Sequence, residues 1–193
     1  MKKSDEMKEL IIKTTIDLIT ESDGDITTIN TRAIADKAQV GTGLVNYHFQ
    51  TKENLIEICV ERMIGKVIAA FAPSIAELSP MAQLKHNVKL VFDFLIGNPA
   101  VSKISILSDY KNPKNDDNTM KSTMGIYRAL GDFGIPKNDR FILAFALVSV
   151  MQNLFLRREQ SEELFGYDLH SKERSDDVLD LIIDNLFGGF GHE

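Results

Sequence analysis

A stretch near the N-terminus, residues 30–55, has the spacing of a nucleic-acid-binding motif. Ile34 and Ala38 are one helical turn apart, and Val45 and Phe49 repeat that spacing after a short break. The pattern predicts two short helices that bury these four residues and are joined by a tight turn. A helix-turn-helix of this kind presents its second helix to the major groove of DNA.

The remaining sides of the two helices carry groups that can contact DNA. The Tyr47 hydroxyl can donate to a phosphate oxygen, and His48 beside it is expected to contact phosphate rather than lie idle on the surface. The Asn46 amide either reads adenine or only caps the helix, and Leu44 can meet a thymine methyl group. The residues expected to contact DNA are Asn30, Thr31, Arg32, Thr42, Gly43, Leu44, Asn46, Tyr47, His48 and Lys52.

This stretch resembles the N-terminal signature of the tetracycline-repressor (TetR) family of bacterial transcriptional regulators. The matching residues are Arg32, Ile34, Ala35, Val40, Gly43, His48, Phe49, Lys52, Glu53 and Leu55. Upstream, Ile11, Ile12, Leu18, Ile19 and Gly24 look like the family's first helix and the loop after it, so the resemblance covers about Met7 to Leu55. It implies a three-helix DNA-binding domain at residues 1–54 and a helical effector-binding and dimerisation domain at residues 55–193.

Three residues depart from the family pattern. Gln39 stands where a glycine usually takes the turn, and left-handed backbone costs a non-glycine residue roughly 1 kcal/mol. Gly41 stands where the family usually has a serine or threonine that caps the helix, and a glycine cap lowers helix stability only slightly. Asn46 replaces a tyrosine, so that tyrosine's contact is not transferred to this chain.

Composition indicates a soluble protein of a reducing compartment. The chain has 193 residues, 44% of them hydrophobic, and Cys59 is the one cysteine, so no disulfide can form within the chain. Acidic residues interrupt the N-terminus, unlike a signal peptide, and the apolar run Phe141 to Val148 is far shorter than the ~20 residues of a membrane helix. We therefore expect a cytoplasmic protein.

The charge distribution predicts modest affinity for DNA. The formal net charge is -6, which by itself argues against a nucleic-acid partner. Between Asn30 and Lys52, however, the cations Arg32, Lys37 and Lys52 outnumber the one anion, Asp36. A weakly basic face on an acidic body predicts non-specific binding that salt readily abolishes.

Beyond the motif, proline, glycine and capping signals divide the chain into further helices, and no alternating strand pattern is present. About nine helices are expected in an all-α fold. The six after the motif are expected at residues 55–72, 80–97, 99–112, 119–133, 138–163 and 172–187.

The last two expected helices are unusually apolar. Residues 141–148 are apolar on all sides of a helix, and residues 178–187 carry a broad apolar stripe. In TetR-like proteins the last two long helices form a four-helix dimer interface, which paired operator half-sites also require. The expected interface residues are Leu147, Met151, Phe155, Leu179, Ile182, Ile183 and Leu186; the alternative is that both stripes only close a monomeric core.

The resemblance also implies a small-molecule effector that releases the dimer from its operator, with residues 55–72 as the lever. An apolar or amphipathic effector is expected, and each pocket candidate could equally be plain core. The candidates are Met63, Val67, Phe92, Ile96, Tyr127 and Phe145.

Nothing in the sequence points to catalysis or to a cofactor. Phosphate loops, nucleophile motifs and Cys/His ligand clusters are absent, and His86, His170 and His192 are isolated. Cys59 is expected to be a small buried hydrophobe, with a redox switch as the minor alternative. The protein is therefore not expected to be an enzyme, and the resemblance to the TetR family implies a repressor. The alternatives are a dimeric helical protein whose N-terminal module binds another protein, and a helical small-molecule carrier or enzyme.

Overall fold

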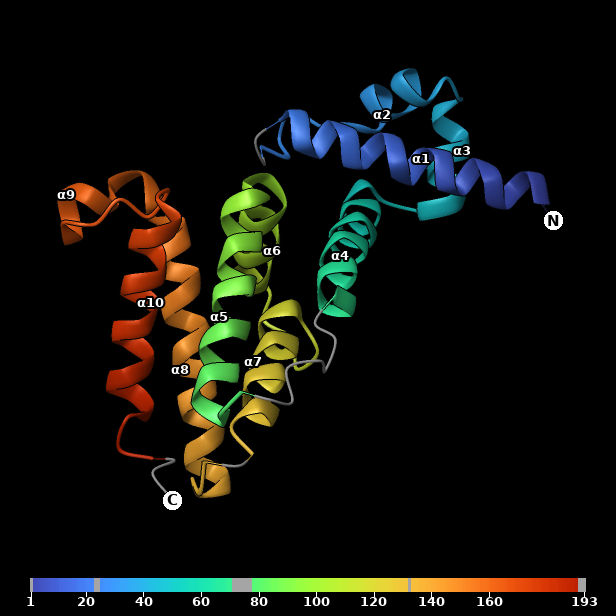
Figure 1. The fold of residues 1–193 in the computed structure, drawn as a ribbon. Coiled ribbons are helices and arrows are strands. Elements are labelled where there is room, and N and C mark those ends of the chain that lie inside the picture. The colour runs from blue at the N-terminus through green and yellow to red at the C-terminus, as the bar shows by residue number, and fades with distance from the viewer. Residues whose placement is uncertain (1, 23–24, 71–77, 132, 191–193) are drawn as a thin grey trace. The chain divides into compact units, whose positions relative to one another are not determined.

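The computed structural model describes residues 2–22, 25–70, 78–131 and 133–190, with the backbone alone at 2–3 and 66–70. All regular elements of the described residues are helices, so the expected all-α fold is confirmed (Figure 1). The elements are α1 (Lys2–Glu21), α2 (Thr31–Ala38), α3 (Thr42–Phe49), α4 (Lys52–Ala70), α5 (Pro80–Gly97), α6 (Pro99–Lys111), α7 (Asn118–Ala129), α8 (Lys137–Leu156), the 3-10 turn η1 (Arg158–Gln160), α9 (Ser161–Phe165) and α10 (Lys172–Phe187).

The chain divides into two compact units. The first unit is Met1–Ala70 with Asn98–Ser108, and the second is Phe71–Gly97 with Asp109–Glu193. Helix α4 stays with the first unit because its residues Leu55 and Cys59 are fully buried in the N-terminal core.

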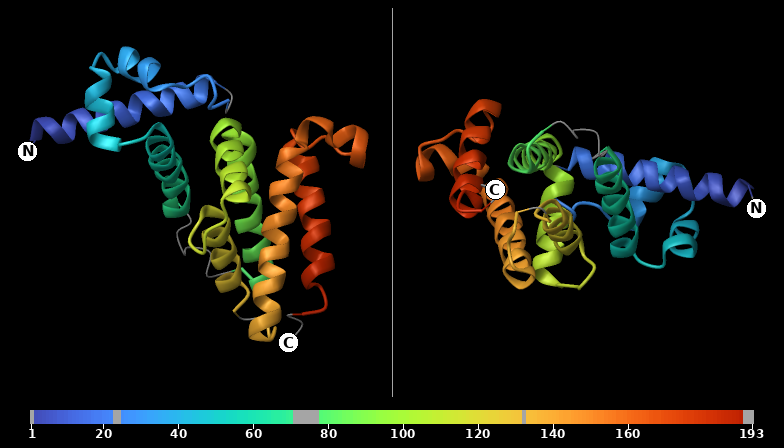
Figure 2. Two further views of the ribbon diagram at one scale, coloured as in Figure 1. Left: turned by 180° about the vertical axis from the view of Figure 1, so that it is seen from behind. Right: turned by 60° about the horizontal axis from the view of Figure 1, so that its bottom comes forward.

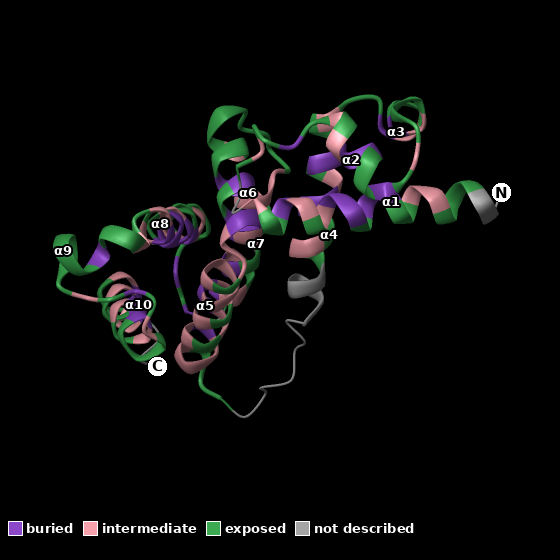
Figure 3. Cartoon of the chain, turned by 90° about the horizontal axis from the view of Figure 1, so that it is seen from above, coloured by how far each residue is buried: buried purple, intermediate pink, exposed green. Residues whose placement is uncertain are grey.

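The core of the first unit is built from one face of each of its helices, whose buried residues are purple in Figure 3. Ile11 and Ile19 of α1, Ile34 of α2 and Phe49 of α3 are each at most 1% exposed. The first half of α6 contributes to the same cluster through Val101. Truncating one of these large side chains to alanine would cost about 2 to 5 kcal/mol.

The turn between α2 and α3 has the conformation that the sequence predicts. The Asn30 side chain caps α2 by accepting a hydrogen bond from the Ala33 amide at 2.9 Å. Gln39 ends the helix in the left-handed region, at φ 55° and ψ 43°. The next amide, that of Val40, donates to the Ala35 carbonyl at 2.9 Å, which closes the turn.

In the second unit, α8 and α10 lie side by side in the views of Figures 1 and 2, and α10 also packs along α5. Ion pairs set the register of α5 against α10: Lys85 lies 2.7 Å from Asp184, and Lys89 lies 2.9 Å from Asp180. Helix α5 begins as expected, because Ser79 caps it ahead of Pro80.

The eighth helix is shorter than the expected 138–163. It ends at Leu156, and a 3-10 turn and the five-residue helix α9 follow. The hydroxyl of Ser161 donates to the Arg158 carbonyl at 2.7 Å and accepts from the Leu169 amide at 3.1 Å, so it holds this irregular segment in place. Helix α7 likewise ends early, at Ala129 instead of near residue 133.

Among the described residues, one helix, α8, is long and apolar enough to cross a membrane. Helices α5 and α6 meet the same criterion only when they are taken together, as a pair bent by 105°. The core helix of a soluble protein meets the same criterion. One side of α8 is such a core face, since Ala144, Leu147 and Phe155 are fully buried.

Candidate nucleic-acid interface

Helix α3 turns its polar residues outward and its apolar ones inward. Val45 and Phe49 are buried, whereas Thr42, Asn46 and Tyr47 are exposed. Tyr47 is 78% exposed, an unusual position for so large a ring in an isolated subunit. The outer face of α3 therefore offers a hydroxyl, an amide and a phenol that the fold itself does not use.

Leu44 and His48, two other expected contacts on α3, are half-buried. Leu44 packs against the core cluster of the first unit, so its apolar side chain has a partner inside the chain. The His48 ring lies edge-on to Tyr47, with the ring centroids 5.2 Å apart. Both residues border the exposed face of α3 rather than form its centre.

The start of α2 supplies the other expected contacts. Arg32 projects from the first turn, with its side chain 86% exposed, and lies 3.7 Å from Asp36 one turn later. Thr31 beside it is half-buried. The Asn30 side chain already serves as the helix cap, which leaves its amide nitrogen for an outside partner.

The other cations of this region are engaged within the chain. Lys37 pairs with Glu21 of α1 at 2.5 Å. The Lys52 ammonium donates to the Ile26 carbonyl at 3.2 Å, and its side chain is only 23% exposed. The weakly basic character predicted from the sequence is thus further reduced, although an ammonium has three donors and can still reach a phosphate.

The exit from α3 is a feature that sequence reasoning missed. Gln50 has φ 65° and ψ −58°, and the Thr51 amide donates to the Phe49 carbonyl at 2.7 Å. This geometry is the rare and strained form of the γ-turn. The Asn54 side chain donates to the same carbonyl at 2.9 Å. No glycine at the turn signals this geometry, so only the coordinates show it.

Comparison with known proteins identifies this part of the chain. Residues 11–59 match the model of the bacterial regulatory proteins of the tetR family. These residues are a DNA-binding domain of the TetR family. The chain is a helix-turn-helix DNA-binding transcriptional regulator, with α2 and α3 as the two helices of the motif. No curated protein matches the sequence.

Several solved structures share the fold over nearly the whole chain. A transcriptional regulator from Rhodococcus sp. Rha1 is 17% identical, with a TM-score of 0.66 over 96% of this chain and 98% of that one. BioQ of Mycobacterium smegmatis is 15% identical, with a TM-score of 0.67 over 92% and 96%. A TetR variant from Acinetobacter baumannii AYE, solved with minocycline, is 17% identical, with a TM-score of 0.66 over 93% of each chain.

The expected effector residues of the TetR-type chain lie in both units. Met63 is half-buried against the core of the first unit, and the side chain of Val67 lies outside the described residues. In the second unit Phe92 is fully buried and Ile96 half-buried, while Phe145 is 44% exposed.

Tyr127 is the expected effector residue with the most defined surroundings. It is half-buried, its ring centroid lies 6.1 Å from that of Phe141, and the Arg140 guanidinium lies 5.4 Å from it. The Arg140 Nε is buried with no hydrogen-bond partner.

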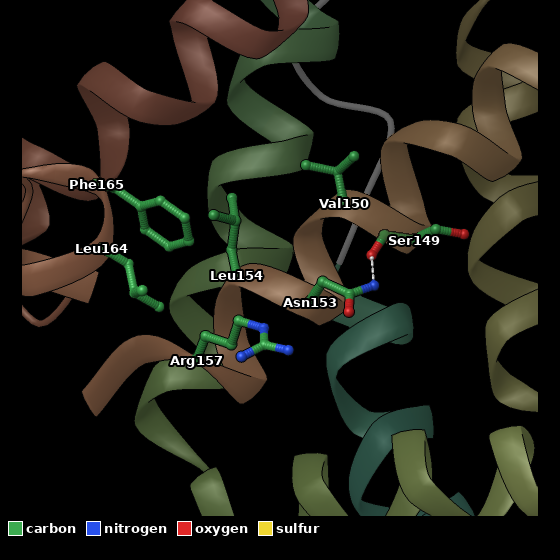
Figure 4. Close-up of a pocket in the computed structure, with 7 residues that line it drawn as sticks. All are labelled: Ser149, Val150, Asn153, Leu154, Arg157, Leu164 and Phe165. Carbon is green, nitrogen blue, oxygen red and sulfur yellow. Dashed lines mark hydrogen bonds between the residues drawn. The ribbon is translucent and has the colours of Figure 1, made fainter. Parts of the chain in front are cut away.

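A cavity of about 550 Å³ opens on the outward side of α8, next to α9 (Figure 4). None of the effector candidates with described side chains lines it. Apolar side chains face it from both helices, with polar groups from α8. Its lining residues are Ser149, Val150, Asn153, Leu154, Arg157, Leu164 and Phe165.

Most of the expected dimer residues lie in the subunit's own core, and their part in a dimer stays a prediction. Five of them are at most 2% exposed in the single subunit: Leu147, Met151, Phe155, Leu179 and Ile183. Ile182 and Leu186 are half-buried. The apolar residues that do face outward include Ile142 and Val150 of α8 and Leu181 of α10.

Cys59 is a core residue. Its thiol donates to the Ile12 carbonyl at 3.6 Å, and burial raises its pKa to about 12. A thiol with so high a pKa stays protonated and unreactive near neutral pH. Within the described residues, no group of three His, Cys, Asp or Glu side chains could hold a metal ion.

Proposed function

We propose that the protein is a ligand-responsive repressor, which binds a palindromic operator as a homodimer and is released by a small apolar or amphipathic effector. The observation that carries the proposal is the exposed face of α3, where Asn46 and Tyr47 project from a helix that Val45 and Phe49 anchor in the core. Such a repressor acts in the cytoplasm by binding DNA and its effector. It is not an enzyme and needs no cofactor.

Roles on this face follow from the chemistry of each group. The Asn46 amide can make two hydrogen bonds to an adenine edge, and Thr42 can bond to a neighbouring base. Tyr47, with Arg32 and Lys52 at the edges, can contact phosphates. A Cβ added at Gly43 would meet nothing within 4 Å inside the chain, so the fold itself does not require a glycine there. The space it leaves suits a close approach of the duplex.

The dimer surface in this proposal is the outward stripe of α8 and α10. Ile142 is 65% exposed and Leu181 57% exposed, which is costly for apolar side chains in a soluble monomer. Phe145 and Val150 continue the stripe on α8, and the cavity beside α9 opens on the same side. A palindromic operator is read by two copies of α3, one for each half-site, on major grooves about 34 to 36 Å apart, so the proposal requires a second copy to cover this surface.

The effector assignment rests on the second unit. The Acinetobacter baumannii TetR variant, which shares the fold, was solved in complex with minocycline, and a small-molecule effector is compatible with that. The half-buried Tyr127 and the buried Phe92 supply aromatic surface, and the exposed Phe145 belongs equally to the outward stripe. An effector that favours one conformation shifts the equilibrium only by its difference in affinity between the two.

Selection of duplexes from a random DNA pool tests the proposal. The protein should enrich a palindrome whose half-sites are centred about one helical turn apart. Asn46→Ala should then relax the preference at one symmetric pair of positions, by about 1 to 3 kcal/mol per half-site. A pool that yields no enriched sequence would contradict operator binding and favour a module that binds another protein.

A further inference from the structure

The last carbonyl of the recognition helix α3 is held from two sides. The Phe49 carbonyl accepts one hydrogen bond from the Thr51 amide at 2.7 Å and a second from the Asn54 side chain at 2.9 Å. Asn54 lies in the first turn of α4. Its amide group therefore links the end of α3 directly to the start of the next helix, across the strained turn at Gln50.

A second tether starts from the same turn of α4. The Lys52 ammonium donates to the Ile26 carbonyl, which lies in the segment leading into α2. The first turn of α4 thus contacts the chain on both sides of the α2–α3 motif. The Thr51 hydroxyl caps α4 by accepting a hydrogen bond from the backbone amide of Asn54 at 3.1 Å. This hydroxyl takes part in neither tether.

We propose that Asn54 is a positioning residue for DNA recognition, whose side-chain amide fixes the direction in which α3 leaves the α3–α4 turn. The proposal rests on the proposed binding of DNA by α3. Asn54 acts through the Phe49 carbonyl and makes no contact with a base.

The length of α3 makes its direction critical. Its eight residues span about 12 Å, so a tilt of about 10° at Phe49 moves the Thr42 end by about 2 Å. Hydrogen bonds to base edges tolerate only a few tenths of an ångström. Contacts to phosphate through long side chains adjust more easily, so a tilt lowers the affinity for the operator more than the affinity for DNA in general.

The experiment compares Asn54→Leu with Thr51→Ala in the full-length protein. Leucine is neutral and branches at Cγ like asparagine but has no donor, and the Phe49 carbonyl retains its bond from Thr51. Thr51→Ala removes the cap of α4 and leaves the Asn54 side chain intact. The probes are the duplex that the wild-type protein enriches from a random pool and a scrambled duplex of equal composition.

We expect Asn54→Leu to lower the ratio of the two affinities about tenfold, with the salt slope and the affinity for scrambled DNA unchanged. Thr51→Ala should lower the melting temperature and keep the ratio. Asn54→Gln, which carries the donor on a longer stem, should recover part of the ratio. An unchanged ratio in Asn54→Leu, or an equal fall in Thr51→Ala, would overturn the proposal, whereas a pool with no enriched duplex would count against operator binding itself.

Discussion

Gln39 and Gln50 hold left-handed backbone on either side of the recognition helix, at φ 55° and φ 65°. Each such residue costs about 1 kcal/mol relative to glycine, because its Cβ crowds the neighbouring carbonyl. Strain of this kind persists where the surrounding contacts determine the backbone, and here the buried Val45 and Phe49 do so. The turns therefore fix α3 at some expense of stability.

Gln39→Gly should stabilise the protein, because glycine adopts this conformation without strain. We expect the free energy of unfolding to rise by about 0.5 to 1 kcal/mol, which is a few degrees in the melting temperature measured by circular dichroism. Gln83→Gly is the control: Gln83 lies in the first turn of helix α5, where its side chain also donates to the Leu78 carbonyl, and glycine should lower stability by about 1 kcal/mol or more. Equal losses in the two variants would show that the turn at Gln39 is not strained.

At the scale of elements, helix ends that depend on local contacts could be predicted, and helix ends that depend on contacts farther along the chain could not. The start of α2 at Asn30 and of α5 at Ser79 followed from capping residues that act within one turn. The end of α8 depends on Ser161, which bonds to an amide eight residues away, and no local pattern reveals that contact. Residues 157–163 were therefore assigned to a helix that ends at Leu156.

The junction of α6 and α7 depends on a carboxylate. One oxygen of Asp109 accepts hydrogen bonds from the amide and the hydroxyl of Thr119, at 2.8 and 2.9 Å. Gln152 of α8 donates to that same hydroxyl at 2.9 Å. Burial raises the pKa of Asp109 above its ordinary 3.8, and Asp117 adds to the rise, although the Thr119 bonds oppose it.

The free energy of unfolding of Asp109→Asn should therefore rise relative to that of the wild-type protein as the pH rises. Because the folded state holds the Asp109 proton more tightly than the unfolded state, its contribution to stability is complete below the unfolded pKa and is lost as the pH rises through the folded pKa. Asparagine retains an acceptor for Thr119 and does not ionise. Urea unfolding of both proteins between pH 3 and pH 7 measures the difference, and a difference independent of pH would contradict the assignment to Asp109.

At the scale of the whole molecule, the sequence predicted which helices carry surplus apolar surface but not which of their faces. Residues 141–148 are apolar all around, so periodicity could not separate the core side of α8 from the outward side. The structure separates them: Leu147 and Ile183 are fully buried, and Ile142 and Leu181 are exposed. The outward residues of α3 were easier to predict, because Asn46 and Tyr47 are polar or amphipathic beside the apolar Val45.

A charge on the exposed stripe should separate the subunits, whereas a charge in the core should unfold them. Leu181→Glu places a carboxylate where the isolated subunit meets solvent, so each subunit should keep its helical content while the dimer dissociates, because association would bury two unpaired charges. Ile183→Glu buries its carboxylate within the subunit and should unfold the protein whether or not a dimer forms. Light scattering with circular dichroism distinguishes these outcomes.

Operator affinity should fall in Leu181→Glu, since one α3 reads only half a palindrome. A folded Leu181→Glu dimer, or a wild-type monomer at micromolar concentration, would move the dimer surface away from the stripe of α8 and α10.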